Sequence, residues 1–275
     1  MYPLYQWLAF FYIYSIFGWI WETSYVSVCK RHFVNRGFLH GPVIPIYGSG
    51  AIVMLFLALP VKDNLVLSYF VGLIGATLLE LFTGWAMEAL FKVKYWDYSD
   101  SRFQFHGYIC LSSSLFWGFL TVALVRWVHA PIERLVLSAS QKPLIAAVGF
   151  FTAFFAFDFV ESAKEALDMR KVIVALESLR EDIDRAQDEL SLKVELGREE
   201  LSGRIEDGRQ QLAELKEQNM RQIEQRISKL KDQWTERLEE FSVFNRRIRR
   251  RHPSATAKHW EEFLSEAKRR LDTKK

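Results

Sequence analysis

Five apolar segments within residues 1–160 restrict the fold of this chain more than any other feature of its sequence. A run of about 20 apolar residues is long enough to cross the hydrocarbon core of a bilayer. Because lipid offers no hydrogen-bond partner to exposed backbone groups, such runs must be helical where they span it. We therefore predict an all-α polytopic membrane domain with five spans, at residues 1–28, 42–60, 65–91, 107–128 and 143–160.

Charge divides the chain into two unlike parts. Residues 1–162 contain 10 Lys or Arg and 9 Asp or Glu, whereas residues 163–275 contain 26 and 24. The near-zero mean hydropathy of the chain is thus an average over two different regions. The pattern predicts three parts: a transmembrane helical domain at 1–162, a long helix or coiled coil at 163–245, and a basic C-terminal tail with a short amphipathic helix at 246–275.

Basic residues in the short loops predict the orientation in the membrane, because Lys and Arg favour the cytoplasmic side. Three lie in 29–40 and three in 92–106, against one in 61–64; three more in 126–142 weaken the contrast. The first apolar segment lacks the basic start and the cleavage site of a signal peptide. We expect a multi-pass protein of the cytoplasmic membrane, with the N-terminus outside and the C-terminal segment in the cytoplasm.

A sequence unit occurs twice, 66 residues apart, and reads G-W-x-x-E followed by R-x-x-x-H-G. Each copy covers the end of one apolar segment and the start of the next, so it predicts two tandem two-helix repeats of equal orientation. The expected pseudo-twofold axis then runs along the membrane normal, as in parallel-repeat transporters. Six identities in 24 positions pair Gly18, Trp19, Glu22, Arg36, His40 and Gly41 with Gly84, Trp85, Glu88, Arg102, His106 and Gly107.

Carboxylates inside apolar spans are the candidate functional groups, because ionisable residues there are costly and are normally paired or face a cavity. The repeat supplies Arg and His partners for its two Glu residues, either as structural ion pairs or as a cytoplasmic pocket for a phosphate or carboxylate headgroup at helix N-termini. A divalent metal on the Glu and His residues is an alternative, but the arginines would compete for the carboxylates, and we predict neither metal nor cofactor.

Of the acidic residues that the two copies do not share, four bear on the candidate site or on the span boundaries. Glu80 lies deeper in the third span and is the best candidate for a protonatable group, while Asp97 in W-D-Y-S either caps a helix or joins the pocket. Asp158 and Glu161 are expected to mark the water boundary of the fifth span. We predict no catalytic residue. The candidate substrate-binding residues are Glu22, Arg36, His40, Glu80, Glu88, Asp97, Arg102 and His106.

Four longer motifs carry a family resemblance. They are F-G-W-x-W-E-T, R-G-F-L-H-G-P-V-I-P-I-Y-G-S-G at residues 36–50, W-D-Y-S, and G-Y-I-C-L-S-S-S-L-F-W-G at 107–118. Over roughly residues 5–160 the chain resembles the bacterial ABC-transporter type IV (CmpB-like) family of integral membrane proteins. The resemblance implies transport without naming a substrate. The sequence has no G-x-x-x-x-G-K-[ST] loop, so any ATP-driven role needs a separate ATPase subunit.

The charged C-terminal part contains apolar and small residues at a spacing of 11, a period close to that of a straight helix. Residues at this spacing form a stripe along one face of a helix. The stripe predicts helix–helix association, between chains or as a folded-back hairpin; a helix that lies on the membrane surface is a weaker alternative. The stripe residues are Leu179, Leu190, Leu201, Leu212, Ile223 and Trp234, then Ile183, Val194 and Ile205, then Ile227 and Leu238, with Ala186, Gly197 and Gly208.

A basic cluster at 246–252 follows the stripe. It fits a solvated helix end, with binding of anionic lipid or nucleic acid as alternatives.

Two functions from different classes follow. The first is a permease-like transporter component of unknown substrate, whose cytoplasmic coiled coil self-associates or recruits a partner. The second is a membrane-embedded enzyme or binding protein acting on an anionic lipid or polyprenyl headgroup. We favour the first. The expected partners are membrane lipid, an ATPase subunit and a second copy of the chain, and we expect no nucleic acid.

Overall fold

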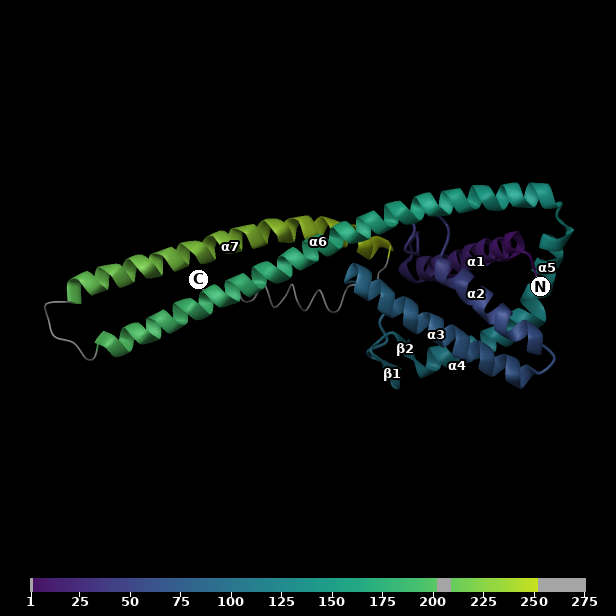
Figure 1. Ribbon diagram of the computed structural model, residues 1–275, viewed down its shortest axis with the longest axis horizontal. Helices are drawn as coiled ribbons and strands as arrows, with labels where there is room; N and C mark the ends of the chain where they lie inside the picture. Colours follow the sequence, from purple (N-terminus) through teal and green to yellow (C-terminus); the bar gives the residue numbers. More distant parts are fainter. Residues whose placement is uncertain (1, 202–208, 252–275) are drawn as a thin grey trace. The chain divides into compact units, whose positions relative to one another are not determined.

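Figure 1 shows the computed structural model of the chain, which describes residues 2–201 and 209–251. Helix makes up 82% of it, and strand is almost absent. The chain divides into two compact units, one holding the residues up to Leu167 and the other beginning at Asp168. We call these the membrane unit and the tail unit. The amphipathic helix expected at 255–271 lies outside the described residues.

Helices form at each of the predicted spans, and the fourth continues beyond its expected end at residue 128. A π-helical turn and a further helix extend it to Ser138. The helices of the membrane unit are α1 (Leu4–Lys30), α2 (Pro45–Ala58) with the 3-10 turn η1 (Leu59–Val61), α3 (Leu65–Phe91), α4 (Leu111–Ala123) with the π turn η2 (Leu124–Val128), α5 (His129–Ser138) and the first part of α6 (Gln141–Leu201).

Three helical segments of the described chain are long and apolar enough to cross a membrane: Leu65–Phe91, Leu111–Ser138 and Gln141–Glu195. Their lengths and apolar composition are those of helices that cross a bilayer. Helix α1 is not among the three, and α2 with η1 is a shorter apolar helix. The count of five spans therefore stays a prediction.

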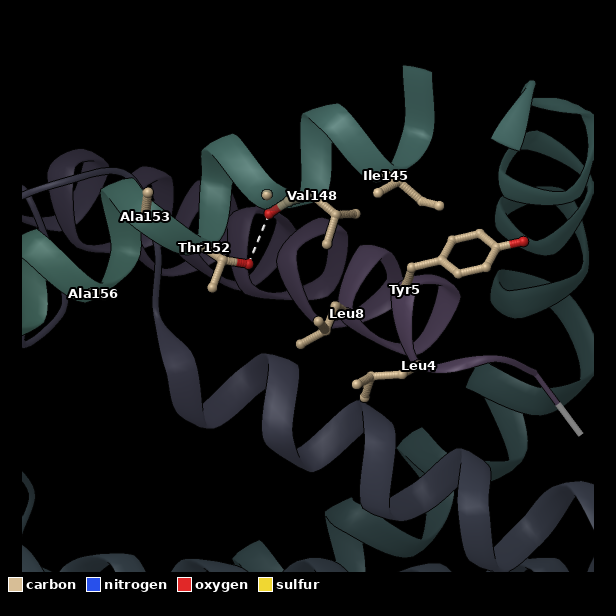
Figure 2. Close-up of a pocket in the computed structure, with 9 residues that line it drawn as sticks. Leu4, Tyr5, Leu8, Ile145, Val148, Thr152, Ala153 and Ala156 are labelled. Atoms are coloured by element: carbon tan, nitrogen blue, oxygen red, sulfur yellow. Dashed lines mark hydrogen bonds between the residues drawn. The ribbon is translucent and has the colours of Figure 1, made fainter. Parts of the chain in front are cut away.

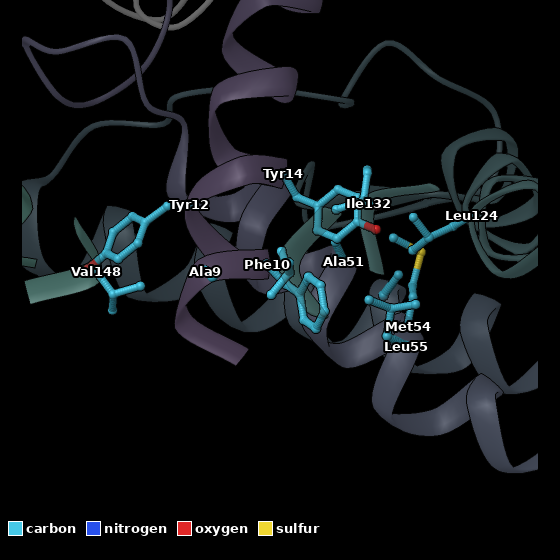
Figure 3. Close-up of a cluster of buried hydrophobic side chains, with 12 residues drawn as sticks. Ala9, Phe10, Tyr12, Tyr14, Ala51, Met54, Leu55, Leu124, Ile132 and Val148 are labelled. Carbon is cyan, nitrogen blue, oxygen red and sulfur yellow. The ribbon is translucent and has the colours of Figure 1, made fainter. Parts of the chain in front are cut away.

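Small residues let the helices of the membrane unit approach closely. A side chain at Gly48 of α2 would place its Cβ 2.1 Å from the Ser15 hydroxyl of α1, and one at Gly72 of α3 would lie 2.0 Å from the Thr121 hydroxyl of α4. Glycine is thus required at both helix crossings. Figure 3 shows the adjoining core, in which Phe10 of α1 and Leu55 of α2 are fully buried.

A short hairpin departs from the all-α expectation in the connection between α3 and α4. Strands β1 (Gln104–Phe105) and β2 (Ile109–Cys110) pair antiparallel, with Phe105 opposite Ile109. Their turn contains His106 and Gly107, both at positive φ. Turn residues at positive φ give the backbone a twist that matches the right-handed twist of the paired strands. The His-Gly element of the second repeat copy is therefore a hairpin turn.

The two repeat copies differ in where the helix ends. Helices α1 and α3 both have 27 residues, and both stop at a basic residue in the left-handed conformation, Arg31 and Lys92. However, Glu22 precedes the last residue of α1 by eight positions, whereas Glu88 precedes that of α3 by only three. The gapless spacing of 66 hides this shift. Superposition of the two helix pairs stays a prediction.

The tail unit contains the later part of α6 and most of α7 (Arg209–Arg251), which are antiparallel in Figure 1. The Arg226 guanidinium of α7 lies 4.0 Å from the Glu189 carboxylate of α6. Ile223 and Trp234, members of the 11-residue stripe, are buried, whereas Val194 is 48% exposed. The stripe thus covers part of the buried face. The coiled coil and its self-association stay predictions.

Candidate functional site

The first repeat copy forms an ion pair between Glu22 of α1 and Arg36 of the following loop. The Arg36 guanidinium donates to one carboxylate oxygen, from Nη2 at 2.6 Å and from Nε at 3.0 Å. The Arg36 side chain is only 12% exposed, and that of Glu22 is 25% exposed. Charged groups withdrawn from solvent to this extent need each other, because either one alone would lose its hydration without compensation.

Hydrogen bonds to α1 place Arg36 beside Glu22. The Trp19 indole donates to the Asn35 side chain at 2.6 Å, and the Asn35 amide donates to the His40 carbonyl at 2.8 Å. The Arg36 backbone N–H donates to the Thr23 hydroxyl. Gly37 then turns the chain at a φ of +118°, a value that only glycine adopts without strain. The loop is therefore folded back along the end of its own helix.

A cavity of about 260 Å³ lies beside this ion pair. Its walls come from the start of α2, from α3, from the connection after α3 and from α6; Pro45, Met87, Trp96 and Phe159 represent these four. Among its lining residues in the described chain, the charged ones are Glu22 and Arg36. The cavity therefore combines apolar walls with one carboxylate and one guanidinium, a composition typical of ligand sites.

The Arg36 guanidinium has hydrogen-bonding capacity that the protein does not use. Its Nη1 is buried and donates to no acceptor in the described chain. Buried donors without a partner are uncommon, since each costs about 1–3 kcal/mol. The Nη1 edge of Arg36 is therefore available to an acceptor from outside the chain.

The second repeat copy does not repeat this arrangement. The Glu88 carboxylate lies 4.0 Å from the Lys94 ammonium, and both side chains are about one-third exposed. Arg102 and His106 are exposed. Asp97 is exposed as well and accepts hydrogen bonds from the backbone and hydroxyl of Ser99. Glu88, Asp97, Arg102 and His106 do not line the cavity.

Glu80 is the most buried carboxylate of α3, with 5% exposure. One of its oxygens accepts from the Tyr98 hydroxyl at 3.0 Å, and the other accepts from Ser113 at 3.3 Å and the Trp117 indole at 3.0 Å. Burial raises the pKa of Tyr98, and the nearby Glu80 charge raises it further, so the phenol stays protonated and donates. Glu80 thus ties the α3–α4 connection and α4 to α3.

His40 joins a carboxylate of α6 instead of the Glu22 pocket. Asp158 accepts from the backbone N–H groups of His40 at 3.0 Å and Gly41 at 2.8 Å. The His40 ring contacts Asp158, Ser162 at 2.8 Å and Glu165 at 3.3 Å. Asp158 is 6% exposed, so it is an internal anchor of the loop. The water boundary of the fifth span at Asp158 and Glu161 stays a prediction.

A polar cluster between α1 and α5 was also outside the sequence expectations. The buried His129 ring contacts the Tyr14 hydroxyl at 2.9 Å and the Tyr2 hydroxyl at 3.2 Å, and Tyr2 also donates to Glu133. The sequence signal for this cluster was the presence of His129 and Glu133 beyond the expected end of the fourth span. The cluster explains why the helix continues past residue 128.

Comparison with known proteins assigns the membrane unit. The family model described as "Putative ABC-transporter type IV" matches residues 9–163. The chain belongs to this family. No curated protein and no solved structure gives a significant match. The family match includes the ion pair, the cavity, Glu80 and Asp158, and it ends before the tail unit begins.

A second hollow of the ABC-transporter type IV unit lies between α1 and α6 and has about 620 Å³ (Figure 2). Leu4, Leu8, Ile145 and Val148 line it, and the Thr152 hydroxyl donates to the Val148 carbonyl of its own helix. This groove contains no charged lining residue in the described chain. Its lining is apolar apart from Tyr5 and Thr152, a composition that fits contact with hydrocarbon better than binding of a charged ligand.

The described residues of this family member contain no group of three or more His, Cys, Asp or Glu side chains placed to hold a metal ion. The Glu22–Arg36 pair and its cavity offer a different kind of recognition. Together they can hold a polar group through Arg36 and an apolar body against the walls.

Proposed function

We propose that this chain is the permease-type membrane component of an ATP-driven transport system, with its ligand held in the Glu22–Arg36 cavity. The cavity carries the proposal, because it joins a charged pair to apolar walls within a family named for ABC transport. The sequence has no G-x-x-x-x-G-K-[ST] loop, so ATP is hydrolysed by a separate subunit.

The remaining candidate residues have secondary roles in this proposal. Glu80 and His40 hold the structures that surround the cavity, because each is bonded to a second element. Glu88, Asp97, Arg102 and His106 do not line the cavity, and the proposal gives them no contact with the ligand. We place all of them on the cytoplasmic side, in a cytoplasmic membrane protein whose N-terminus is outside.

The tail unit recruits the ATPase or sets the number of copies in the assembly. Its helices carry salt-bridged polar faces, as in the i,i+4 pairs Lys193–Glu189 and Arg221–Glu217, and bury an apolar line that includes Ile223 and Trp234. Such helices suit contact with other proteins in water. A cytoplasmic position of the tail unit places it where ATP is available.

The test uses the full chain in membranes of its native host, cross-linked before solubilisation. We expect a protein with a P-loop to be recovered in fixed ratio, and the isolated complex to hydrolyse ATP. Replacing the P-loop lysine of that protein should abolish hydrolysis and leave the complex intact. Recovery of the chain without a P-loop protein and without ATP hydrolysis, from several mild detergents, would contradict the proposal.

A further inference from the structure

We infer that the Glu22–Arg36 cavity binds a zwitterionic amphiphile, with an oxyanion on Arg36, an ammonium group near Glu22 and hydrocarbon against the apolar walls. This inference rests on the proposed use of the cavity as the ligand site. The charges of the cavity lining favour a ligand that carries both signs. Within its described lining the cavity has one cation and one anion, so a ligand of single charge would be attracted by one group and repelled by the other.

The buried Nη1 atom of Arg36 can donate to an oxyanion of the ligand. Two other nitrogens of the guanidinium, Nε and Nη2, already donate to Glu22, whereas Nη1 has no acceptor in the described chain. Guanidinium groups bind phosphate and carboxylate oxygens through such N–H pairs. An oxyanion on this edge would satisfy the donor while leaving the Glu22 contact in place.

The wall of the cavity favours a ligand with a hydrocarbon part. Ile44, Ile46, Met87 and Phe159 contribute apolar surface, which a small hydrophilic solute would leave poorly covered. Burial of hydrocarbon contributes about 25 cal/mol per Å². The apolar lining therefore favours a headgroup that carries a chain over the free headgroup.

The position of the cavity also fits an amphiphile. The cavity is lined by the last part of α1, the first residues of α2, the last part of α3 and Phe159 of α6, together with the loops after α1 and α3. It therefore lies toward one end of the membrane unit's helices and not at their middle. The ends of spanning helices lie at the level of lipid headgroups, where both the polar and the apolar parts of an amphiphile are present.

Native mass spectrometry of the purified full chain in non-ionic detergent tests the inference. The probes are phosphatidylethanolamine, which is zwitterionic, phosphatidylglycerol, which is anionic, and free O-phosphoethanolamine. We expect one phosphatidylethanolamine per chain, bound at least about tenfold more tightly than phosphatidylglycerol, a difference of about 1.4 kcal/mol. The free headgroup should bind more weakly than the lipid by a similar factor.

Two independent variants locate the binding. Thr83→Phe fills the cavity from α3 and leaves both charges in place, whereas the double variant Glu22→Gln with Arg36→Gln removes both charges; Gln has the size of Glu22 and is two heavy atoms shorter than Arg36. Each should weaken phosphatidylethanolamine binding by at least about tenfold. The matched control is Glu161→Gln with Lys164→Gln, an exposed ion pair of α6 away from the cavity, which should leave binding unchanged.

The outcomes are distinct. Equal or tighter binding of phosphatidylglycerol, or unchanged binding in folded Thr83→Phe protein, would overturn the inference. Binding of O-phosphoethanolamine as tight as that of the lipid would overturn the requirement for hydrocarbon. None of these results affects recovery of the ATPase, so the ligand class and the proposed function fail separately.

Discussion

The two repeat copies contain the same Glu and Arg residues, yet they form different structures. In the first copy, Glu22 and Arg36 make a close pair with little exposure, at 2.6 Å. In the second, Glu88 lies 4.0 Å from Lys94 and Arg102 is exposed. The difference arises because α3 ends five residues earlier than α1 relative to its Glu, and a hairpin occupies the longer connection.

This comparison shows that a duplicated sequence unit can keep its charged residues and lose their contact. The first copy builds a cavity on its ion pair, whereas the second attaches its connection to α3 through a different carboxylate, Glu80. Four predictions test this division of roles, in order of decreasing effect on the free energy of unfolding.

Arg36→Ala should cause the largest loss of stability. It leaves the Glu22 carboxylate, which is 25% exposed, without its cation. We expect a decrease of about 2–4 kcal/mol in the free energy of unfolding, somewhat below the value for a fully buried pair. Denaturant titration with SDS in mixed micelles measures it. The control Lys94→Ala should cost about 0–1 kcal/mol, because its pair is long and partly hydrated. Equal losses would mean that the two copies do not differ energetically.

Asp158→Ala should have the next largest effect, because it removes the acceptor of the His40 and Gly41 backbone N–H groups. Two donors lose a charged partner, and we expect about 2–3 kcal/mol of destabilisation. Hydrogen exchange should become faster at residues 40–41. In the second copy, Gly107 donates to the Gln104 side chain instead, so Gln104→Ala should cost about 1 kcal/mol. Unchanged exchange in Asp158→Ala protein would argue against its anchoring role.

Glu80→Gln should destabilise the protein by about 1–2 kcal/mol, since three donors lose the charge that they bind and the new amide adds a donor among them. Glu88→Gln should cost less than about 0.5 kcal/mol, because its ion pair with Lys94 is long and the side chain is partly exposed. Unfolding titrations of the two variants give the ranking. A larger effect at Glu88 would assign the anchoring role in the second copy to the repeated residue after all.

Sequence reasoning reached the helices and the first ion pair for a simple physical reason. Long apolar runs have one common solution in lipid, which is a helix, and a carboxylate near the end of such a run needs a nearby cation. Glu22 and Arg36 are linked by a loop short enough to return to the same helix end. The short spacing between the two residues was therefore sufficient to predict this ion pair.

The same reasoning could not predict the structure of the second copy or the contacts between α6 and the loop after α1. The connection after α3 packs on Glu80 through Tyr98, a contact between residues 18 positions apart on different elements. Asp158 lies 118 positions from His40. In the sequence, a charged residue at the end of an apolar run is equally consistent with the water boundary of a span and with a buried hydrogen-bond acceptor. Only the folded structure distinguishes the two.

Trp19 and Trp85 provide the test with the smallest expected effect, because they occupy equivalent positions in the repeat and differ in one hydrogen bond. The Trp19 indole donates to Asn35 at 2.6 Å and so holds the loop that carries Arg36, whereas Trp85 is 54% exposed. Trp19→Phe keeps an aromatic ring and removes this donor, which should cost about 1 kcal/mol. Trp85→Phe should stay within about 0.5 kcal/mol of the unchanged protein, as is usual for exposed positions. Unfolding titrations of both variants in the same micelles measure the difference. If Trp19→Phe is neutral, the Asn35 contact does not position the loop, and the backbone bond from Arg36 to Thr23 must be sufficient to keep Arg36 beside Glu22.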